Sequence, residues 1–153
     1  MQAICSNHKL ILHLILVTGA SGFLGQHLLQ ALAHQPLPVV GLYNTRPPAV
    51  TYPNVTYQQC DLLDIFSVEE VMQGVSQVYH CAAIVSFDAR YRDAMINGNV
   101  AATANVANAA LEAGVSKFIH ISSIAALGRT AIITEQHKEI DEDTHWEESK
   151  ANS

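Results

Sequence analysis

The chain has 153 residues, of which 49% are hydrophobic and 14% are charged. This composition suits one domain with a sizeable core and excludes a disordered chain. The formal net charge is −6, so the sequence gives no electrostatic reason to expect nucleic acid or an anionic membrane as a partner.

The first predicted elements surround a glycine-rich turn. Residues 1–9 are expected to form a disordered leader, and the apolar run from Leu10 to Val17 predicts a parallel strand that is buried on both faces. The turn follows as Thr18-Gly19-Ala20-Ser21-Gly22-Phe23-Leu24-Gly25. Apolar residues at helical spacing then predict a helix from Phe23 to about His34.

Strand and helix patterns alternate along the rest of the chain. Further strands are predicted at 37–43, 54–60, 75–83 and 115–122. The stretch Asp61-Leu62-Leu63-Asp64 is predicted to start a short helix that presents Ile65, Val68, Val71 and Met72 on one face.

A long helix is predicted before the last of these strands. It runs from about Ala94 to Ala113, and Gly114 is expected to stop it. Its expected apolar stripe consists of Val100, Ala104, Ala107 and Leu111.

The glycine turn carries the main functional signal. A strand, a glycine turn and a helix start form a site for a dinucleotide pyrophosphate, because first-turn N–H groups and the positive helix end face the ligand. Gly19 allows the tight exit from the strand, Gly22 lets the backbone approach the phosphates, and Gly25 lets the helix pack closely on the sheet.

The order of elements predicts the fold class. Right-handed crossovers wind it into an α/β fold, a Rossmann-like, doubly wound open parallel sheet with helices on both faces. We expect this sheet to be truncated before its sixth strand. The dinucleotide-binding domain is predicted over residues 10–133. Residues 134–153 are polar and acidic, and we expect a loop there that leads to a missing catalytic helix and substrate domain.

Cysteine and histidine spacing excludes other kinds of site. Cys5, Cys60 and Cys81 form neither an even disulfide set nor a pair at metal-ligand spacing, which predicts a reduced, cytoplasmic protein. The eight histidines also lack ligand spacing, so we expect no metal. No apolar run is long enough to span a bilayer, and we expect no membrane partner.

The glycine spacing resembles that of a known group of enzymes. Three-residue steps from Gly19 to Gly22 to Gly25, with Thr18 in front, resemble the extended branch of the short-chain dehydrogenase/reductase superfamily, the NAD-dependent epimerase/dehydratase family. His80-Cys81-Ala82-Ala83 resembles the fourth-strand H-x-A-A signature of that family.

Two further segments extend the resemblance. Asn99-Val100-Ala101-Ala102-Thr103-Ala104-Asn105-Val106 resembles N-V-x-G-T-x-N-V, with Ala102 in place of the usual glycine. Asp61-Leu62 is similar to the acidic dipeptide that hydrogen-bonds the adenine amino group. Asp61 as an N-cap of the following helix is the alternative, and both roles can hold at once.

The resemblance implies a set of site residues. Cofactor contacts are expected from Thr18, Gly19, Ser21, Gly22, Phe23, Leu24, Gly25, Tyr43, Arg46, Asp61, Leu62, Cys81, Ala82, Ala83, Asn99 and Ser122. Ser123 matches the catalytic serine by its register with Gly128, with Ser122 as the alternative. Asn99 is also expected to support catalysis.

The chemistry implied by the resemblance is hydride transfer between nicotinamide and a carbonyl or secondary alcohol. In the family a tyrosine supplies the proton, and a lysine four residues later lowers the tyrosine pKa. None of the five tyrosines here is followed by lysine at that spacing. We therefore expect the chain to be the N-terminal portion of a longer enzyme and to be inactive alone.

The end of the second strand bears on cofactor choice. It reads Tyr43-Asn44-Thr45-Arg46, without the acid that binds the ribose hydroxyls of NAD. Arg46 favours NADP, because the extra phosphate attracts a guanidinium. The alternative is that Arg46 is a solvated loop charge.

These observations favour an oxidoreductase acting on a small carbonyl or alcohol, similar to the dihydroflavonol-reductase and hydroxysteroid-dehydrogenase group. A nucleotide-sugar epimerase or dehydratase is the alternative within the family. A non-catalytic NAD(P)-binding sensor or scaffold is the alternative outside enzymes. The full-length protein is a possible homodimer.

Overall fold

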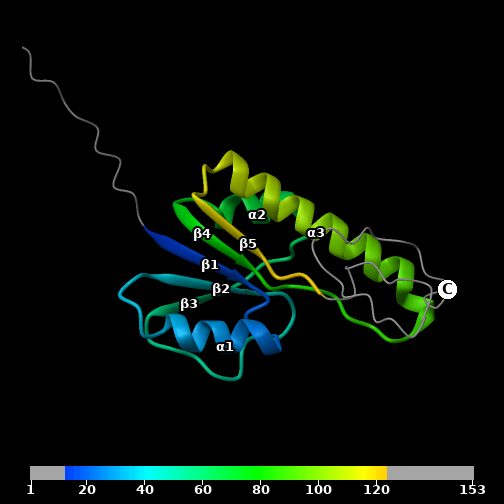
Figure 1. The fold of residues 1–153 in the computed structure, drawn as a ribbon, viewed down its shortest axis with the longest axis horizontal. Helices are drawn as coiled ribbons and strands as arrows, with labels where there is room; N and C mark the ends of the chain where they lie inside the picture. The colour runs from blue at the N-terminus through cyan, green and yellow to red at the C-terminus, as the bar shows by residue number, and fades with distance from the viewer. Residues whose placement is uncertain (1–12, 124–153) are drawn as a thin grey trace, which may run out of the picture. The chain divides into compact units, whose positions relative to one another are not determined.

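The computed structural model describes residues 13–123 (Figure 1). The chain divides into two compact units, Met1–His120 and Ile121–Ser153, and the described helices and strands all lie in the first. These elements are β1 (Leu14–Thr18), α1 (Phe23–Leu32), β2 (Val39–Tyr43), β3 (Val55–Gln59), α2 (Ile65–Val71), β4 (Val75–His80), the short 3-10 helix η1 (Ala89–Tyr91), α3 (Arg92–Glu112) and β5 (Lys117–His120). The predictions for residues 1–9 and 134–153 lie outside the described residues.

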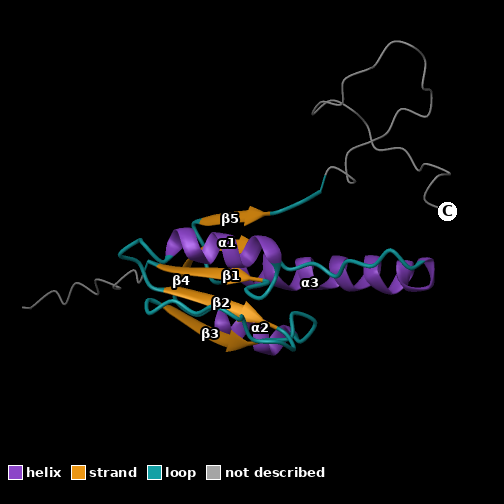
Figure 2. Cartoon of the chain, turned by 90° about the horizontal axis from the view of Figure 1, so that it is seen from below, coloured by secondary structure: helices purple, strands orange, loops and turns teal. Residues whose placement is uncertain are grey.

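The five strands form one parallel sheet in the order β3-β2-β1-β4-β5. Figure 2 shows the strand arrows pointing the same way. The first helix covers one face, and α2 and α3 cover the other (Figure 1). The predicted Rossmann-like, doubly wound α/β fold is confirmed.

Two cores flank the central strand β1, which has neighbours on both sides. Leu16 packs with Val78 of β4 and Val106 of α3, whereas Val17 packs with Leu29 of α1. Both faces of β1 are covered, so the strand reads as a continuous apolar run rather than an alternating one.

The long helix α3 ends as the sequence predicts. Gly114 adopts a φ of 71°, and its N–H donates to the carbonyl of Leu111. The N–H of Val115 donates to the carbonyl of Ala110, which completes a Schellman cap. Because the Val115 N–H is used in this way, β5 begins at Lys117 rather than at the predicted Val115.

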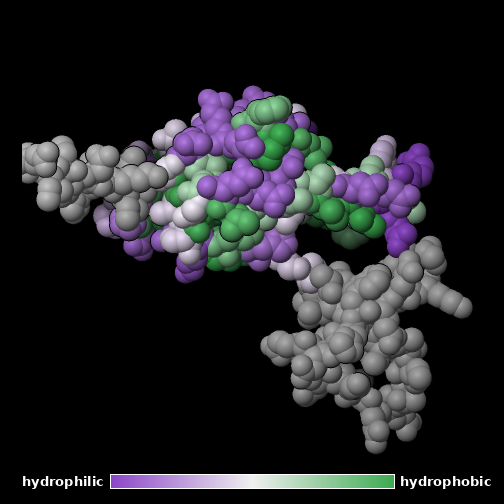
Figure 3. Space-filling view, turned by 90° about the horizontal axis from the view of Figure 1, so that it is seen from above, coloured by the Kyte–Doolittle hydropathy of each residue, from purple (hydrophilic) through white to green (hydrophobic). Residues whose placement is uncertain are grey.

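The apolar stripe predicted for α3 is wrong. Val100 is 63% exposed and Leu111 is 80% exposed, whereas Val106, Ala109 and Ala110 are buried. An alanine-rich helix has several weakly apolar faces, and close packing on the sheet selects the one with small side chains. Seen from the side of α2 and α3, apolar side chains interrupt the polar surface (Figure 3).

The predicted strand 75–83 is also too long, since β4 ends at His80. The next two backbone N–H groups, of Cys81 and Ala82, donate to the hydroxyl of Thr18 at 3.2 and 3.1 Å. A side chain of β1 thereby replaces a strand partner, and the backbone leaves the sheet at this point.

The short helix α2 is capped by Asp64 rather than by Asp61. Asp64 accepts hydrogen bonds from the hydroxyl of Ser67 and the backbone N–H of Phe66, and these bonds, that of Ser67 foremost, lower the pKa of its carboxyl. The alternative reading of Asp61 as the N-cap is therefore wrong. Among residues 13–123, no helix combines the length and the apolar character needed to cross a bilayer.

Candidate functional site

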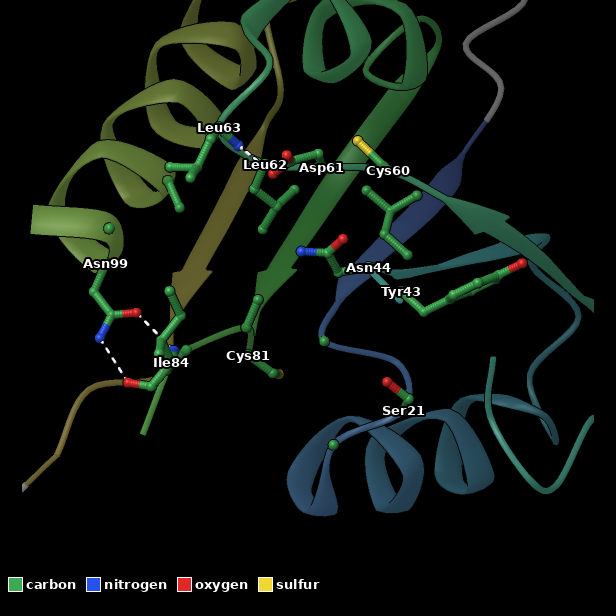
Figure 4. A pocket seen from close by; sticks show the side chains of 17 residues that line it. Ser21, Tyr43, Asn44, Cys60, Asp61, Leu62, Leu63, Cys81, Ile84 and Asn99 are labelled. Carbon is green, nitrogen blue, oxygen red and sulfur yellow. Dashed lines mark hydrogen bonds between the residues drawn. The ribbon is translucent and has the colours of Figure 1, made fainter. Parts of the chain in front are cut away.

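A cavity of about 260 Å³ lies at the carboxyl edge of the sheet (Figure 4). It is lined by Gly19, Ser21, Gly22, Leu42, Tyr43, Asn44, Cys60, Asp61, Leu62, Leu63, Cys81, Ala82, Ala83, Ile84, Gly98, Asn99 and Ala102. Segments that follow four strands meet there with one face of α3. The crevice outside the carboxyl ends of parallel strands is where open α/β sheets bind ligands.

The glycine turn after β1 requires residues without side chains at two positions. Gly19 has a φ of 71°, and a Cβ there would lie 2.8 Å from the backbone nitrogen of Ala82. A Cβ on Gly25 would overlap the carbonyl oxygen of Gly19. The close contact that Gly25 allows is therefore with the glycine turn itself, not with the sheet as predicted.

The start of α1 is suited to an anion. Its N-cap is Gly22, no side chain caps the first turn, and the first turn carries no acidic residue. The first N–H groups of a helix lack partners within the helix and carry a partial positive charge. Because Ser21 and Gly22 line the cavity, these groups suit the phosphates of a dinucleotide.

A buried histidine joins β4 to two other elements. His80 Nδ1 lies 2.8 Å from the hydroxyl of Thr18, and Nε2 lies 3.1 Å from the hydroxyl of Thr103 on α3. Since Thr18 already accepts two backbone N–H groups, its own proton points to Nδ1. His80 is therefore the neutral Nε2–H tautomer, which donates to Thr103.

Burial sets the charge state of this histidine. His80 is 1% exposed, and burial, together with the nearby His120, lowers its pKa to about 4. The two rings stack with centroids 5.3 Å apart. At neutral pH the imidazole is uncharged, so it supports the end of β4 as a hydrogen-bonding group rather than as a cation.

Two thiols line the cavity. Burial, with the neighbouring carboxylates of Asp61, Asp64 and Glu70, raises the pKa of Cys60 to about 11, and burial also raises the pKa of Cys81. Both are protonated at neutral pH, so neither is an activated nucleophile. The cavity is suited to binding and does not supply thiolate chemistry.

Most of the predicted cofactor residues meet in this cavity. Those that line it are Gly19, Ser21, Gly22, Tyr43, Asp61, Leu62, Cys81, Ala82, Ala83 and Asn99. Of the others, Thr18 is buried and bonds the backbone after β4, and Gly25 packs on the glycine turn. Phe23, Leu24 and Arg46 are exposed outside the lining.

The two predicted serines belong to the other compact unit of the chain. Ser122 and Ser123 are exposed residues that follow β5 and belong to the second compact unit, residues 121–153. Gly128, which set their register, lies outside the described residues. Their roles therefore stay predictions.

Sequence reasoning missed several lining residues. They are Leu42, Asn44, Cys60, Leu63, Ile84, Gly98 and Ala102. Leu42, Asn44 and Cys60 could have been found, because they lie at or just after the carboxyl ends of predicted strands. Gly98 and Ala102 also carried a signal, since two small residues four positions apart share one helix face.

Known proteins match this chain over most of its length. The model of the NAD dependent epimerase/dehydratase family matches residues 15–151. Sterol demethylase protein B of Methylococcus capsulatus is 32% identical over 115 residues, which cover 74% of this chain and 35% of that protein. The 3 beta-hydroxysteroid dehydrogenase/Delta 5-->4-isomerase of Vaccinia virus is 30% identical over 118 residues, which cover 73% and 34%.

A solved structure is also similar to this chain in both sequence and fold. A short-chain dehydrogenase/reductase superfamily protein from Agrobacterium tumefaciens, crystallised with bound NAD, is 31% identical with a TM-score of 0.67. The match covers 79% of this chain and 36% of that one. The chain spans about a third of the length of the curated relatives it matches. By its sequence, its sheet and its glycine turn, the chain belongs to the NAD dependent epimerase/dehydratase family.

Proposed function

We propose that this chain is the cofactor-binding part of an NAD(P)-dependent oxidoreductase that transfers hydride between nicotinamide and a small carbonyl or secondary alcohol. The cavity at the carboxyl edge carries the proposal. It joins the glycine turn to Asp61, to the segment after β4 and to Asn99, residues that are up to 80 positions apart in the sequence.

Each part of the cavity suits one part of a dinucleotide. Gly19, Ser21 and Gly22 would hold the pyrophosphate at the start of α1. The Asp61 carboxylate would accept a hydrogen bond from the adenine amino group. The small residues Ala82 and Ala83 would leave room for the nicotinamide ribose. When bound, the cofactor supplies the hydride.

The proton-transfer residues form a separate part of the proposal. Ser123 would hydrogen-bond the substrate oxygen. The Tyr-x-x-x-Lys pair of the family has no counterpart in the 153 residues, and we propose that further sequence supplies it. The length of the curated relatives supports this view, since each is about three times the matched part. The chain alone is then expected to bind cofactor without turnover.

We further propose a preference for NADP. Tyr43 and Asn44 line the cavity at the end of β2, and no acid follows this strand to bind the ribose hydroxyls. Arg46 is exposed two residues beyond, where a guanidinium can reach a ribose phosphate. The related Agrobacterium protein was crystallised with NAD, so the choice needs a direct test.

The test is to titrate the chain with NADPH and, separately, with NADH, and to monitor binding by the fluorescence of the nucleotide. We expect tighter binding of NADPH, and we expect Arg46→Ala to weaken NADPH about tenfold while NADH changes little, because one charge-assisted phosphate contact is lost. Lys117→Ala is the control, because Lys117 begins β5 at the amino edge of the sheet, opposite the cavity. This variant should alter neither the NADPH nor the NADH affinity. NADH binding as tight as NADPH would contradict the preference, and binding of neither would contradict the function.

A nucleotide-sugar epimerase or dehydratase is the second candidate, favoured by the match to the NAD dependent epimerase/dehydratase family. Such an enzyme retains its NAD through the reaction. The full-length protein distinguishes the two, because an oxidoreductase consumes added NADPH with a carbonyl, and an epimerase does not. A protein that binds cofactor with neither activity would be a sensor or scaffold.

A further inference from the structure

Two asparagine side chains of α3 each hold a loop that lines the cavity. Asn105 donates from Nδ2 to the carbonyl oxygens of Leu62 and Leu63, at 3.0 and 3.3 Å. Asn99 lies six residues before Asn105 on the same helix, and its side chain hydrogen-bonds the backbone N–H and the carbonyl of Ile84. One helix is thus hydrogen-bonded to both the loop after β3 and the loop after β4.

The contact made by Asn105 fixes the peptide unit between Leu62 and Leu63. Its carbonyl oxygen accepts from Asn105, and its N–H donates to Asp61 Oδ1 at 3.0 Å. A peptide unit held at both ends cannot rotate without breaking a bond, so the Asp61 carboxylate is held in one orientation. Among residues 13–123, Asp61 Oδ2 has no hydrogen-bond partner and remains open to a ligand.

The contact made by Asn99 fixes the other loop. Asn99 Oδ1 accepts from the N–H of Ile84 at 2.7 Å, and Nδ2 donates to its carbonyl at 2.9 Å (Figure 4). The side chain of Ile84 lies over Gly98, where a Cβ would come within 3.0 Å of its Cδ1. Backbone and side chain of Ile84 are therefore both placed by α3.

The two loops lie on opposite sides of the glycine turn. In the strand order β3-β2-β1-β4, Asp61 follows β3 on one side of β1, and Ile84 follows β4 on the other side. In a doubly wound sheet the pyrophosphate lies at the turn after the first strand, and the adenosine ribose lies at the end of the second. The adenine half then faces the Asp61 loop, and the nicotinamide half faces the Ile84 loop.

We propose that α3 positions the two halves of the dinucleotide independently, Asn105 acting on the adenine half through Asp61 and Asn99 on the nicotinamide half through Ile84. Asn105 is a positioning residue in this scheme, because it acts through Asp61. The proposal rests on the proposed cofactor function of the cavity.

The test compares the affinities of AMP, which carries only the adenosine half, and of NADPH or NADH, whichever the unaltered chain binds more tightly. We expect Asn105→Ala to weaken AMP and the dinucleotide by the same factor, about tenfold, since one oriented charged contact is lost. Asn99→Ala should weaken the dinucleotide and leave AMP within about twofold. Asn105→Asp, which keeps the shape and removes the donor, should behave as Asn105→Ala.

Asn108→Ala is the matched control, because Asn108 is exposed on the same helix and the change in helix propensity is identical. It should alter neither affinity, and circular dichroism should show each variant folded. Equal loss of AMP affinity in Asn99→Ala and Asn105→Ala would overturn the proposal, since it would indicate a general loosening of the helix. Unchanged AMP binding in both Asn105 variants would also overturn it. If the unaltered chain binds no nucleotide, the proposed function itself fails.

Discussion

His80 links the end of β4 to β1 and α3 through the two nitrogens of one ring. Each nitrogen needs a partner of opposite character, and the hydroxyl of Thr18 already serves the backbone of Cys81 and Ala82. Only the neutral ring satisfies all of these groups. A proton on Nδ1 would place two donors against each other inside the core, which is costly where no water reaches.

The pKa of about 4 predicts how stability depends on pH. Above pH 6.5 the ring is neutral in the folded and the unfolded chain and contributes no pH dependence. Between pH 6.5 and 4 the imidazole is protonated in the unfolded chain but stays neutral in the folded chain. The free energy of unfolding therefore decreases as the pH is lowered through this range, by about 3 kcal/mol in total. Urea unfolding across this range measures the slope.

Two variants isolate the contribution of His80. His80→Gln cannot titrate, so its unfolding free energy should fall less steeply between pH 6.5 and 4. His34→Gln, which makes the same change at an exposed histidine, is the control. A His80→Gln chain with the original slope would refute the assignment.

At the scale of the element, α3 combines packing with positioning. Its buried face is small and apolar, with Val106, Ala109 and Ala110 in contact with the core on that side of the sheet. Its polar side chains reach the loops at the carboxyl edge. A helix that packs closely on the sheet can place these side chains accurately, because its backbone is rigid.

The end of α3 offers a test of backbone conformation alone. Gly114 has a φ of 71°, and a Cβ there would meet nothing within 4 Å. Gly114→Ala should therefore lower the free energy of unfolding by about 1 kcal/mol through the left-handed conformation only. Gly114→Asn should lose less, because Asn tolerates this conformation. Urea unfolding of both variants checks the order, and a larger loss for Asn would contradict it.

At the scale of the whole molecule, the cavity depends on the parallel sheet. Residues from Gly19 to Ala102 meet there because every parallel strand ends at the same edge. Cys81 lies in this lining and is half-buried, whereas Cys60 is buried. A bound dinucleotide should therefore cover Cys81.

Thiol labelling tests this expectation. In a Cys5→Ser background, Ellman's reagent should modify Cys81 about tenfold more slowly when NADPH is present at ten times its Kd. Cys60 should react slowly with or without nucleotide, since burial raises its pKa to about 11. Cys81→Ala should abolish the protected phase. Equal labelling rates at saturating NADPH would place the nucleotide elsewhere.

Much of the fold and part of the site could be predicted from local patterns. The strand, turn and helix around Gly19, the alternation of strands and helices along the chain and the stop at Gly114 follow from residues close together in the sequence. Asp61, Ala82 and Asn99, which line the cavity, are predicted in the same way, because each belongs to a short motif. The local pattern predicts the wrong end for β4, because the strand stops at His80 where the next backbone N–H donates to the distant Thr18 hydroxyl.

Local sequence is sufficient to predict the class of fold, the glycine turn and the family, because these depend on the period of apolar residues and on motifs a few residues long. Contacts between distant elements set which face of α3 is buried, which tautomer His80 adopts and which loops Asn99 and Asn105 hold. The hydrogen bonds among these join residues 15 to 62 positions apart, and the buried face of α3 packs against Leu16, which lies 90 positions before Val106. Such partners come together only when the sheet forms, so no local pattern records them.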